Sequence, residues 1–92
     1  MNAYEAVIIL TKKISDEQAE EVKNKISDLI SSNGEIVSVD NWGMKKLAYE
    51  IKKEAEGHYY LYTFNAKADF ISEFERTLRI DDSVLKHMVV KK

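Results

Sequence analysis

Hydrophobic and polar residues follow different patterns in different parts of the chain, and each pattern predicts either a strand or a helix. Residues 3–10 are hydrophobic almost throughout and rich in β-formers, which is typical of a central strand. Ser15 and Gln18 have the spacing of a capping box, so a helix is predicted to begin at Asp16 and run to Ser32. Its apolar side chains recur at helical spacing: Ala19, Val22, Ile26, Leu29 and Ile30.

Glycines divide the middle of the chain. Asn33 and Gly34 tolerate a left-handed backbone, which is a common way for a helix to end, so the first helix is predicted to stop there. Strand patterns return over residues 35–39 and 45–51. Gly43 lies between them and is predicted to mark a bend or a bulge.

A hairpin is predicted next. Residues 52–57 are charged and end in glycine, so they are expected to connect to a strand over residues 58–65. Alternation in that strand places Tyr60, Tyr62 and Phe64 on one face and the neighbouring Tyr59 and Leu61 on the other.

The last third of the sequence predicts a helix and a strand. Asp69 is expected to cap the helix, and Asp81 with Asp82 to end it. Residues 84–90 have the composition of a final strand. The apolar positions of the helix are Phe70, Ile71, Phe74 and Leu78.

The order β-α-β-β-α-β predicts an α+β fold of the ferredoxin-like, split β-α-β type. Right-handed crossovers on one sheet give an antiparallel arrangement of four strands in the order 4-1-3-2, with both helices on one face. Residues 1–92 are expected to form a single domain, because 92 residues suffice for one core and not for two. This fold serves many functions and does not decide between them.

Composition excludes several kinds of site. The chain has no cysteine, which excludes disulfides, thiolate metal sites and a thiol nucleophile, and which suits a reducing compartment. The longest apolar run, residues 6–10, is far shorter than the roughly 20 residues of a membrane helix. The sequence therefore predicts a cytoplasmic protein without a membrane partner.

Charge argues against a free-standing nucleic-acid binder. The chain has 14 basic and 16 acidic side chains, a net charge of −2, whereas such binders are usually strongly basic. Residues 1–44 hold four basic and eight acidic side chains, and residues 45–92 hold ten and eight. Any basic surface is therefore expected to be local and C-terminal.

No pattern of residues predicts catalysis. Only His58 and His87 could supply an imidazole, and neither has a convincing partner for nucleophilic or metal chemistry. Adjacent acids such as Asp81 and Asp82 are usually turn formers, and the glycines occur singly rather than in a phosphate-binding cluster. The sequence predicts a protein that is not an enzyme, with no metal, cofactor or small-molecule substrate.

The middle of the chain carries a specific family resemblance. The block Trp-Gly-Met-Lys-Lys-Leu-Ala-Tyr-Glu-Ile, residues 42–51, closely resembles the signature of the bacterial ribosomal protein S six family, the sixth protein of the small subunit. Weaker matches run along nearly all 92 residues, including Tyr4-Glu5, Gly34 to Ile36, Leu78 to Ile80 and Val84 to Lys86. Many relatives have proline at the position of Glu50 and arginine at that of Lys86, and many carry a longer tail.

The resemblance implies a structural constituent of the small ribosomal subunit. Similar proteins bind the central domain of small-subunit ribosomal RNA as a heterodimer with ribosomal protein S eighteen, in the cytoplasmic ribosome. An acidic chain should bind RNA weakly alone, because affinity depends on neutralising phosphates, so a basic partner is expected. The alternative is a small-molecule-binding or regulatory ferredoxin-like module that self-associates through its sheet.

Two sites are expected if this resemblance holds. The second strand is a sheet edge in this fold, so residues 42–51 are predicted to bind the protein partner; the alternative is an edge whose lysines serve only solubility. Its predicted contact residues are Trp42, Lys45, Lys46, Leu47, Tyr49 and Ile51. The predicted RNA-binding residues, expected to lie near one another, are Asn2, Tyr4, Arg79, Lys86, Lys91 and Lys92.

Two further expectations concern charges on the helices. Arg79 has a second interpretation, as a cation that complements the helix dipole. The acidic face of the first helix is expected to point away from RNA; it carries Asp16, Glu17, Glu20 and Glu21.

Overall fold

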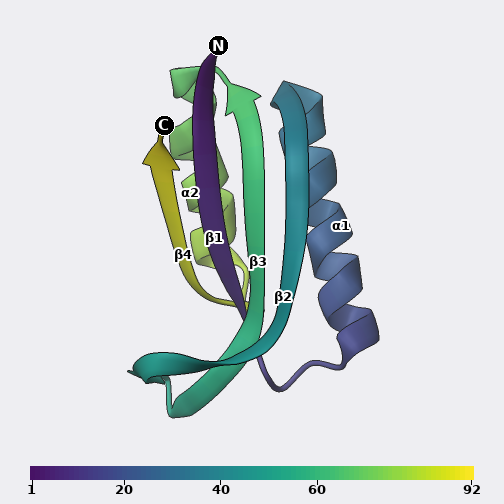
Figure 1. Ribbon diagram of the computed structural model, residues 1–92, viewed down its shortest axis with the longest axis vertical. Helices are drawn as coiled ribbons and strands as arrows, with labels where there is room; N and C mark the ends of the chain where they lie inside the picture. The colour runs from purple at the N-terminus through teal and green to yellow at the C-terminus, as the bar shows by residue number, and fades with distance from the viewer.

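A four-stranded sheet forms the centre of the computed structural model, which describes all 92 residues (Figure 1). The strand order is β2-β3-β1-β4 and neighbouring strands are antiparallel, so the predicted ferredoxin-like order, 4-1-3-2 read from the other edge, is confirmed. The elements are β1 (Asn2–Thr11), α1 (Asp16–Asn33), β2 (Gly34–Ile51), β3 (Glu54–Ala66), α2 (Ala68–Ile80) and β4 (Val84–Lys91).

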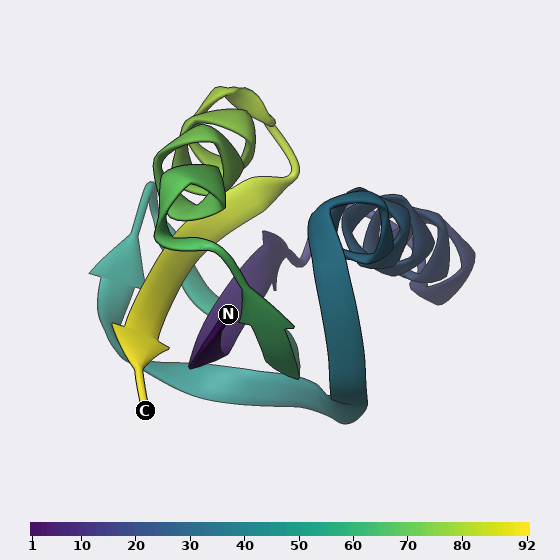
Figure 2. The same cartoon turned by 90° about the horizontal axis from the view of Figure 1, so that it is seen from above.

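Both helices cover the same face of the sheet (Figure 2). Alternation along β1 turns Tyr4, Ala6 and Ile8 toward the helices, and all three are buried. In β3 the predicted face of Tyr60 and Phe64 is confirmed as part of the same core. Neither helix has the length and apolar composition that a membrane span requires.

Aromatic contacts join the sheet to the helices. The ring of Phe74 in α2 meets that of Phe64 edge to face, with centroids 5.6 Å apart. The Tyr62 hydroxyl donates a 3.0 Å hydrogen bond to the Lys23 carbonyl oxygen in α1. Burial raises the pKa of Tyr62, so this phenol stays protonated and continues to donate.

The start of α1 agrees with the prediction and its end does not. The Gln18 amide donates to the Ser15 hydroxyl at 3.2 Å and the Ser15 amide to the Gln18 side chain at 2.9 Å, which confirms the capping box. Gly34 is not left-handed but extended, with φ −171°, because the chain turns directly into β2. Glycine is needed there for another reason: a Cβ would collide with the carbonyl oxygen of Asn65.

The expected cap of α2 is wrong. Lys67 occupies the N-cap position and makes no side-chain capping bond, whereas Asp69 lies in the first turn, where a negative charge favours the helix dipole. The other end agrees with the prediction. The helix stops at Ile80, and the Asp81 carboxylate accepts a 2.9 Å hydrogen bond from the Ser83 amide in the turn that follows.

One long strand, β2, replaces the two predicted strands. Its register with β3 shifts between Asn41 and Gly43, where Gly43 has φ +76° and its amide donates to the Asn41 side chain at 2.8 Å. The predicted bulge at Gly43 is confirmed. The predicted connection over residues 52–57 is too long, because β3 already begins at Glu54 and only Lys52 and Lys53 form the turn.

Buried Glu54 explains why β3 begins so early. The Thr11 hydroxyl lies 2.7 and 2.8 Å from its two carboxylate oxygens, and the Lys12 amide donates to it at 2.9 Å. Burial alone would raise the pKa of Glu54, but these hydrogen bonds and the charges of Lys13 and Lys12 outweigh it and lower the pKa. The carboxylate therefore ties the hairpin to the end of β1.

Glu54→Gln should reduce stability at neutral pH by about 1–3 kcal/mol, because the ionised form is the one that the hydrogen bonds favour. A lowered pKa stabilises the fold above the unfolded value of about 4.3, and this contribution is lost as the pH falls through the folded value. Urea unfolding between about pH 3 and pH 7 measures the free energy of unfolding of the wild-type and variant proteins. The difference between these two free energies, the stability gap, should narrow in acid. Glu73→Gln, on an exposed position of α2, controls for the lost charge. A gap that is the same at every pH would contradict this assignment.

Candidate functional site

The predicted partner segment lies on an edge of the sheet. Residues 42–51 belong to β2, whose outer side faces no other strand (Figure 1). Most side chains here are turned to solvent: Trp42 is 45% exposed, Met44 46% and Tyr49 61%, whereas the predicted contacts Leu47 and Ile51 are half-buried. An unpaired strand edge next to exposed aromatic side chains can accept a further strand.

The two lysines of this segment are free of ion pairs. Lys45 pairs with Gly57 in the β2–β3 register, and its ammonium lies 5.2 Å from the centroid of the Trp42 ring. Lys46 stands opposite Glu56 in the register without forming a salt bridge. Unpaired positive charge on an edge discourages pairing with a second copy of the same strand and leaves the edge open to a different partner.

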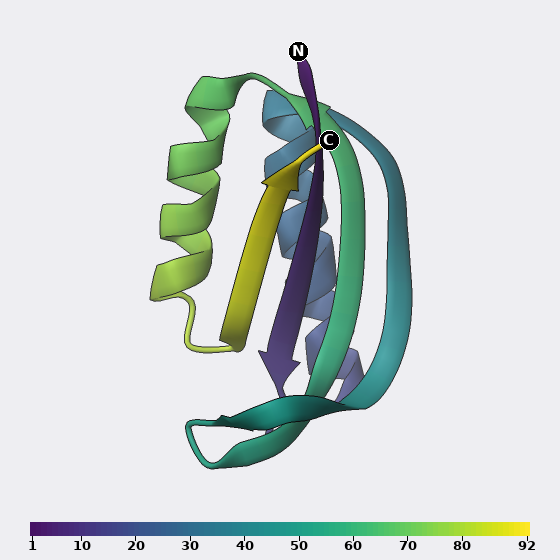
Figure 3. The same ribbon diagram turned by 60° about the vertical axis from the view of Figure 1, so that its left-hand side comes forward.

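The far end of the β2–β3 hairpin bends away from the sheet and passes below β4 (Figure 3). This bend brings Tyr49 to Lys86, whose ammonium donates a 2.9 Å hydrogen bond to the Tyr49 hydroxyl. The same ammonium lies 5.0 Å from the centroid of the Tyr49 ring. A residue predicted to bind protein and a residue predicted to bind RNA therefore contact each other, which sequence spacing does not indicate.

The six predicted RNA-binding residues do not form one cluster. Tyr4 pairs with Lys91 across β1 and β4, and the Lys92 amide donates to the Ala3 carbonyl at 2.8 Å, so these residues and Asn2 share the end of the sheet at which both termini lie. Arg79 lies in the last turn of α2, toward the opposite end of the sheet (Figure 3). The structure thus separates two groups that were expected to be neighbours.

Tyr4 is a core residue. It is only 6% exposed, and its ring stacks on that of Phe64 with centroids 5.7 Å apart. The Asn2 side chain donates to its hydroxyl at 3.4 Å. The ring is therefore closed to stacking by a nucleic-acid base, and an RNA contact of Tyr4 through its other atoms stays a prediction.

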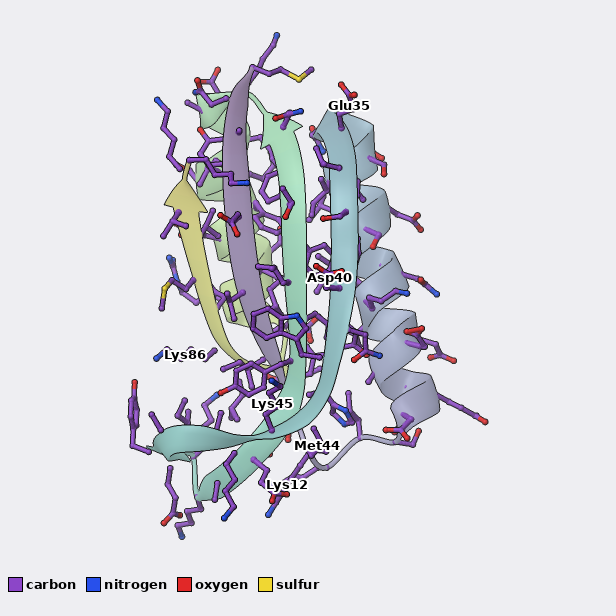
Figure 4. All side chains as sticks on the ribbon, in the orientation of Figure 1. Lys12, Glu35, Asp40, Met44, Lys45 and Lys86 are labelled. Carbon is purple, nitrogen blue, oxygen red and sulfur yellow. The ribbon has the colours of Figure 1, made fainter.

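Lysines that were not predicted to bind RNA gather at the hairpin end of the molecule. Thr11 and Lys45 both stand opposite Gly57, so the end of β1 and the bulged part of β2 lie at the same level of the sheet. Figure 4 shows Lys12, Lys45 and Lys86 in this region, well apart from Glu35. We call this region the basic end and define it by six exposed residues: Lys12, Lys13, Lys45, Lys46, Lys52 and Lys53.

The expectation of a C-terminal basic surface is therefore too narrow. The basic end takes two lysines from the loop after β1 and four from the β2–β3 hairpin. Glu50 and Glu56, from the same hairpin, only partly offset its charge. A signal was present in the sequence, because each of three Lys-Lys pairs lies at or near a reversal or a bulge of the chain.

The tight turn of the hairpin is strained. Lys52 and Lys53 have φ of 50° and 66°, and they are the only residues other than glycine with positive φ. A turn of type I′ needs positive φ at both central positions and strongly prefers Asn-Gly. Lysine at both central positions of this turn is therefore unfavourable for the local backbone energy.

Replacing the turn by Lys52→Asn together with Lys53→Gly should raise the free energy of unfolding by about 1 kcal/mol, because the strain of two left-handed side-chain-bearing residues is relieved. Urea unfolding measures the change. Lys91→Asn with Lys92→Gly makes the same change in composition at the chain end and should leave stability nearly unaltered. A loss of stability in the turn variant would contradict the strain argument.

The two histidines lie on different strands, His58 in β3 and His87 in β4. His58 is 5% exposed and its Nε2 lies 3.3 Å from the Ile14 carbonyl oxygen, while His87 stands opposite Ile8 in the register of β4. No three His, Asp or Glu side chains are close enough together to hold a metal ion.

Comparison with known proteins decides the family. A family model described as Ribosomal protein S6 matches residues 3–91. The chain belongs to the ribosomal protein S6 family. The resemblance of residues 42–51 to that family is thereby confirmed.

Relatives in this family match over almost their whole length. The small ribosomal subunit protein bS6 of Alkaliphilus oremlandii is 42% identical over 91 residues, covering 99% of this chain and 97% of its own. That of Clostridioides difficile is 41% identical over 90 residues, covering 98% of each chain. The crystal structure of 30S ribosomal protein S6 from Thermotoga maritima superposes with a TM-score of 0.94 at 27% identity, over 99% of this chain and 87% of that one.

The fold by itself is shared more widely. Hydroxynitrile lyase from Passiflora edulis superposes with a TM-score of 0.51 at 15% identity over 99% of this chain. That likeness concerns architecture alone, since one fold carries many chemistries. The family assignment rests on the sequence matches and on the much closer S6 structure.

Proposed function

We propose that the protein is a structural component of the small ribosomal subunit that binds small-subunit ribosomal RNA jointly with ribosomal protein S eighteen. The observation that carries the proposal is the open edge of β2, which presents unpaired backbone and two free lysines in a chain of net charge −2. Membership of the S6 family supports it, because the relatives are named as small ribosomal subunit proteins. The site of action would be the cytoplasmic ribosome.

The distribution of charge explains why a partner is needed. The acidic residues of the first turns of α1 lie on the side of the molecule next to β2, and the helix runs alongside that edge (Figure 1). A basic protein that pairs with β2 meets this negative charge directly. The complex then carries the positive charge that the chain lacks and gains affinity for phosphates through counterion release.

The RNA contacts are assigned mainly to the basic end. Its six lysines are exposed, and Lys86 adds a further charge beside them through its contact with Tyr49. The C-terminal Lys91 and Lys92 form a second, smaller group at the other end of the sheet. Lysines act as point charges toward phosphate, so these groups would position the complex on RNA without reading base sequence.

The partner role is tested by Lys45→Glu with Lys46→Glu. Because the proposed partner is basic, reversing these charges next to the docked strand should strengthen the complex with S eighteen by about tenfold, or about 1.4 kcal/mol, in a calorimetric titration. Lys91→Glu with Lys92→Glu carries the same charge change at the far end of the sheet and should have little effect. Equal affinities for the wild-type protein and the β2 variant would contradict the edge as the binding site.

The RNA role is tested with the turn variant Lys52→Asn, Lys53→Gly. It should lower the affinity of the S eighteen complex for central-domain RNA, and the slope of log affinity against log salt should shrink by about 1 to 2 as two phosphate contacts are lost. Since the same variant is expected to be more stable, unfolding cannot account for the loss. A greater loss of RNA affinity in the variant Lys91→Asn with Lys92→Gly would contradict this assignment and place the RNA contact at the chain ends.

A further inference from the structure

A pocket of about 390 Å³ lies between the start of α1 and the bulged part of β2. Met44 marks its place at the lower end of β2 in Figure 4. The pocket opens beside the free edge of the strand, on the face of the sheet that carries α1. Its lining residues are Asp16, Glu20, Asn41, Gly43, Met44, His58 and Tyr60.

Tyr60 contributes a phenol hydroxyl that has no partner within the protein. The residue is only 2% exposed, yet its hydroxyl makes no hydrogen bond, whereas the hydroxyls of Tyr4, Tyr49 and Tyr62 all do. Burial, together with the charges of nearby Glu20 and Asp16, raises the pKa of Tyr60. No buried side-chain polar atom of the protein lacks a hydrogen-bond partner, so this hydroxyl reaches the open pocket, where it can bond a ligand group.

His58 contributes an acceptor. Its Nε2 lies 3.3 Å from the Ile14 carbonyl oxygen, which can only accept, so Nε2 carries a proton. In the neutral ring Nδ1 is then an acceptor. Nδ1 lies 3.9 Å from a carboxylate oxygen of Asp16, too far for a hydrogen bond.

The carboxylates at the mouth make the pocket negative. The Asp16 side chain is 99% exposed, and that of Glu20 is 50% exposed and forms a 3.2 Å ion pair with Lys23. An exposed pair of this kind is worth little and yields readily to a competing cation. The Asn41 amide oxygen already accepts from the Gly43 amide.

This donor-poor lining matches one kind of ligand group. A cation with several N–H donors in a plane can bond a carboxylate, an imidazole nitrogen and a phenol oxygen together, and arginine has that geometry whereas lysine is a point charge. A metal ion fits less well, because no three ligating side chains converge here.

We propose that this pocket receives an arginine side chain of the basic partner. The inference rests on the proposed function, because a segment that pairs along β2 would turn alternate side chains toward the face of the sheet that carries α1. One of these would enter at the level of Asn41 to Met44, where the pocket opens beside the edge. The arginine would thus fix the register of the partner strand on a bulged edge.

The test is a calorimetric titration of S eighteen into three variants of the full chain. Asp16→Asn with Glu20→Gln should weaken binding about tenfold. Glu17→Gln with Glu21→Gln removes the same charge from the same turns of α1 outside the pocket and should weaken it less than about twofold. Tyr60→Phe keeps the buried ring, removes only the hydroxyl and should weaken binding about threefold to tenfold.

Equal losses in the two double variants would mean that only the overall charge of α1 matters and would overturn the pocket as an arginine site. Unchanged affinity in the Asp16, Glu20 variant would overturn it as well. The variants must keep the wild-type unfolding curve within about 1 kcal/mol, because a larger change assigns the side chains to stability.

A second measurement separates this inference from the proposed function. N-acetylarginine methylamide, titrated into the free protein, should shift the NMR signals of the Tyr60 and His58 rings more than the lysine analogue does. Shifts at these rings without any binding of S eighteen would support the pocket and contradict the proposed partner. If S eighteen binds but the pocket variants lose no affinity and the arginine analogue shifts no ring signals, the proposed partner would be supported and the arginine pocket contradicted.

Discussion

The rest of the molecule depends on one constraint: the large apolar side chains are buried between one face of the sheet and the two helices. Two helices are enough to cover one face of four strands, and the largest fully buried side chains, among them Tyr62, Phe64 and Phe74, lie between the sheet and those helices. The other face carries no helix and is only partly covered, since Ile9 on it is 6% exposed while Val7 and Leu61 are half-buried. The outer edge of β2 and the end of the hairpin are open to solvent. The surfaces available for partners therefore follow from the way in which the core is filled.

Acidic and basic side chains lie in separate regions of the surface that this arrangement leaves open. The first turns of α1 place acidic side chains beside β2, and the hairpin with the loop after β1 places six lysines at the basic end. A net charge of −2 conceals this separation. Because exposed charges interact over about a Debye length of 8 to 10 Å, each region acts on the partner nearest to it rather than as part of an average. The acidic side suits a basic protein, and the basic end suits phosphate.

Regular alternation made most of the fold predictable from the sequence. The inward face of β3, the capping box of Ser15 and the bulge at Gly43 depend on residues close together in the chain, and all three were confirmed. The errors came from contacts between distant residues. Gly34 is required by the approach of Asn65 rather than by a left-handed backbone, and β3 starts early because Glu54 bonds Thr11.

The candidate sites were harder to predict for the same reason. That β2 is an edge follows from topology, but the contact of Tyr49 with Lys86 and the burial of Tyr4 depend on how the hairpin bends and how the core packs. The basic end unites lysine pairs that are up to about forty residues apart, which no local pattern shows. The pocket at Tyr60 likewise needs α1, β2 and β3 together.

We propose above all that the outer edge of β2 is an unpaired strand edge that binds a basic partner. Amide hydrogen exchange measured residue by residue, with and without S eighteen, tests it most directly. The account predicts that the β2 amides that do not pair with β3 exchange rapidly in the free chain and become strongly protected in the complex. Slow exchange of these amides in the free chain, or protection confined to β4 or the helices in the complex, would contradict it.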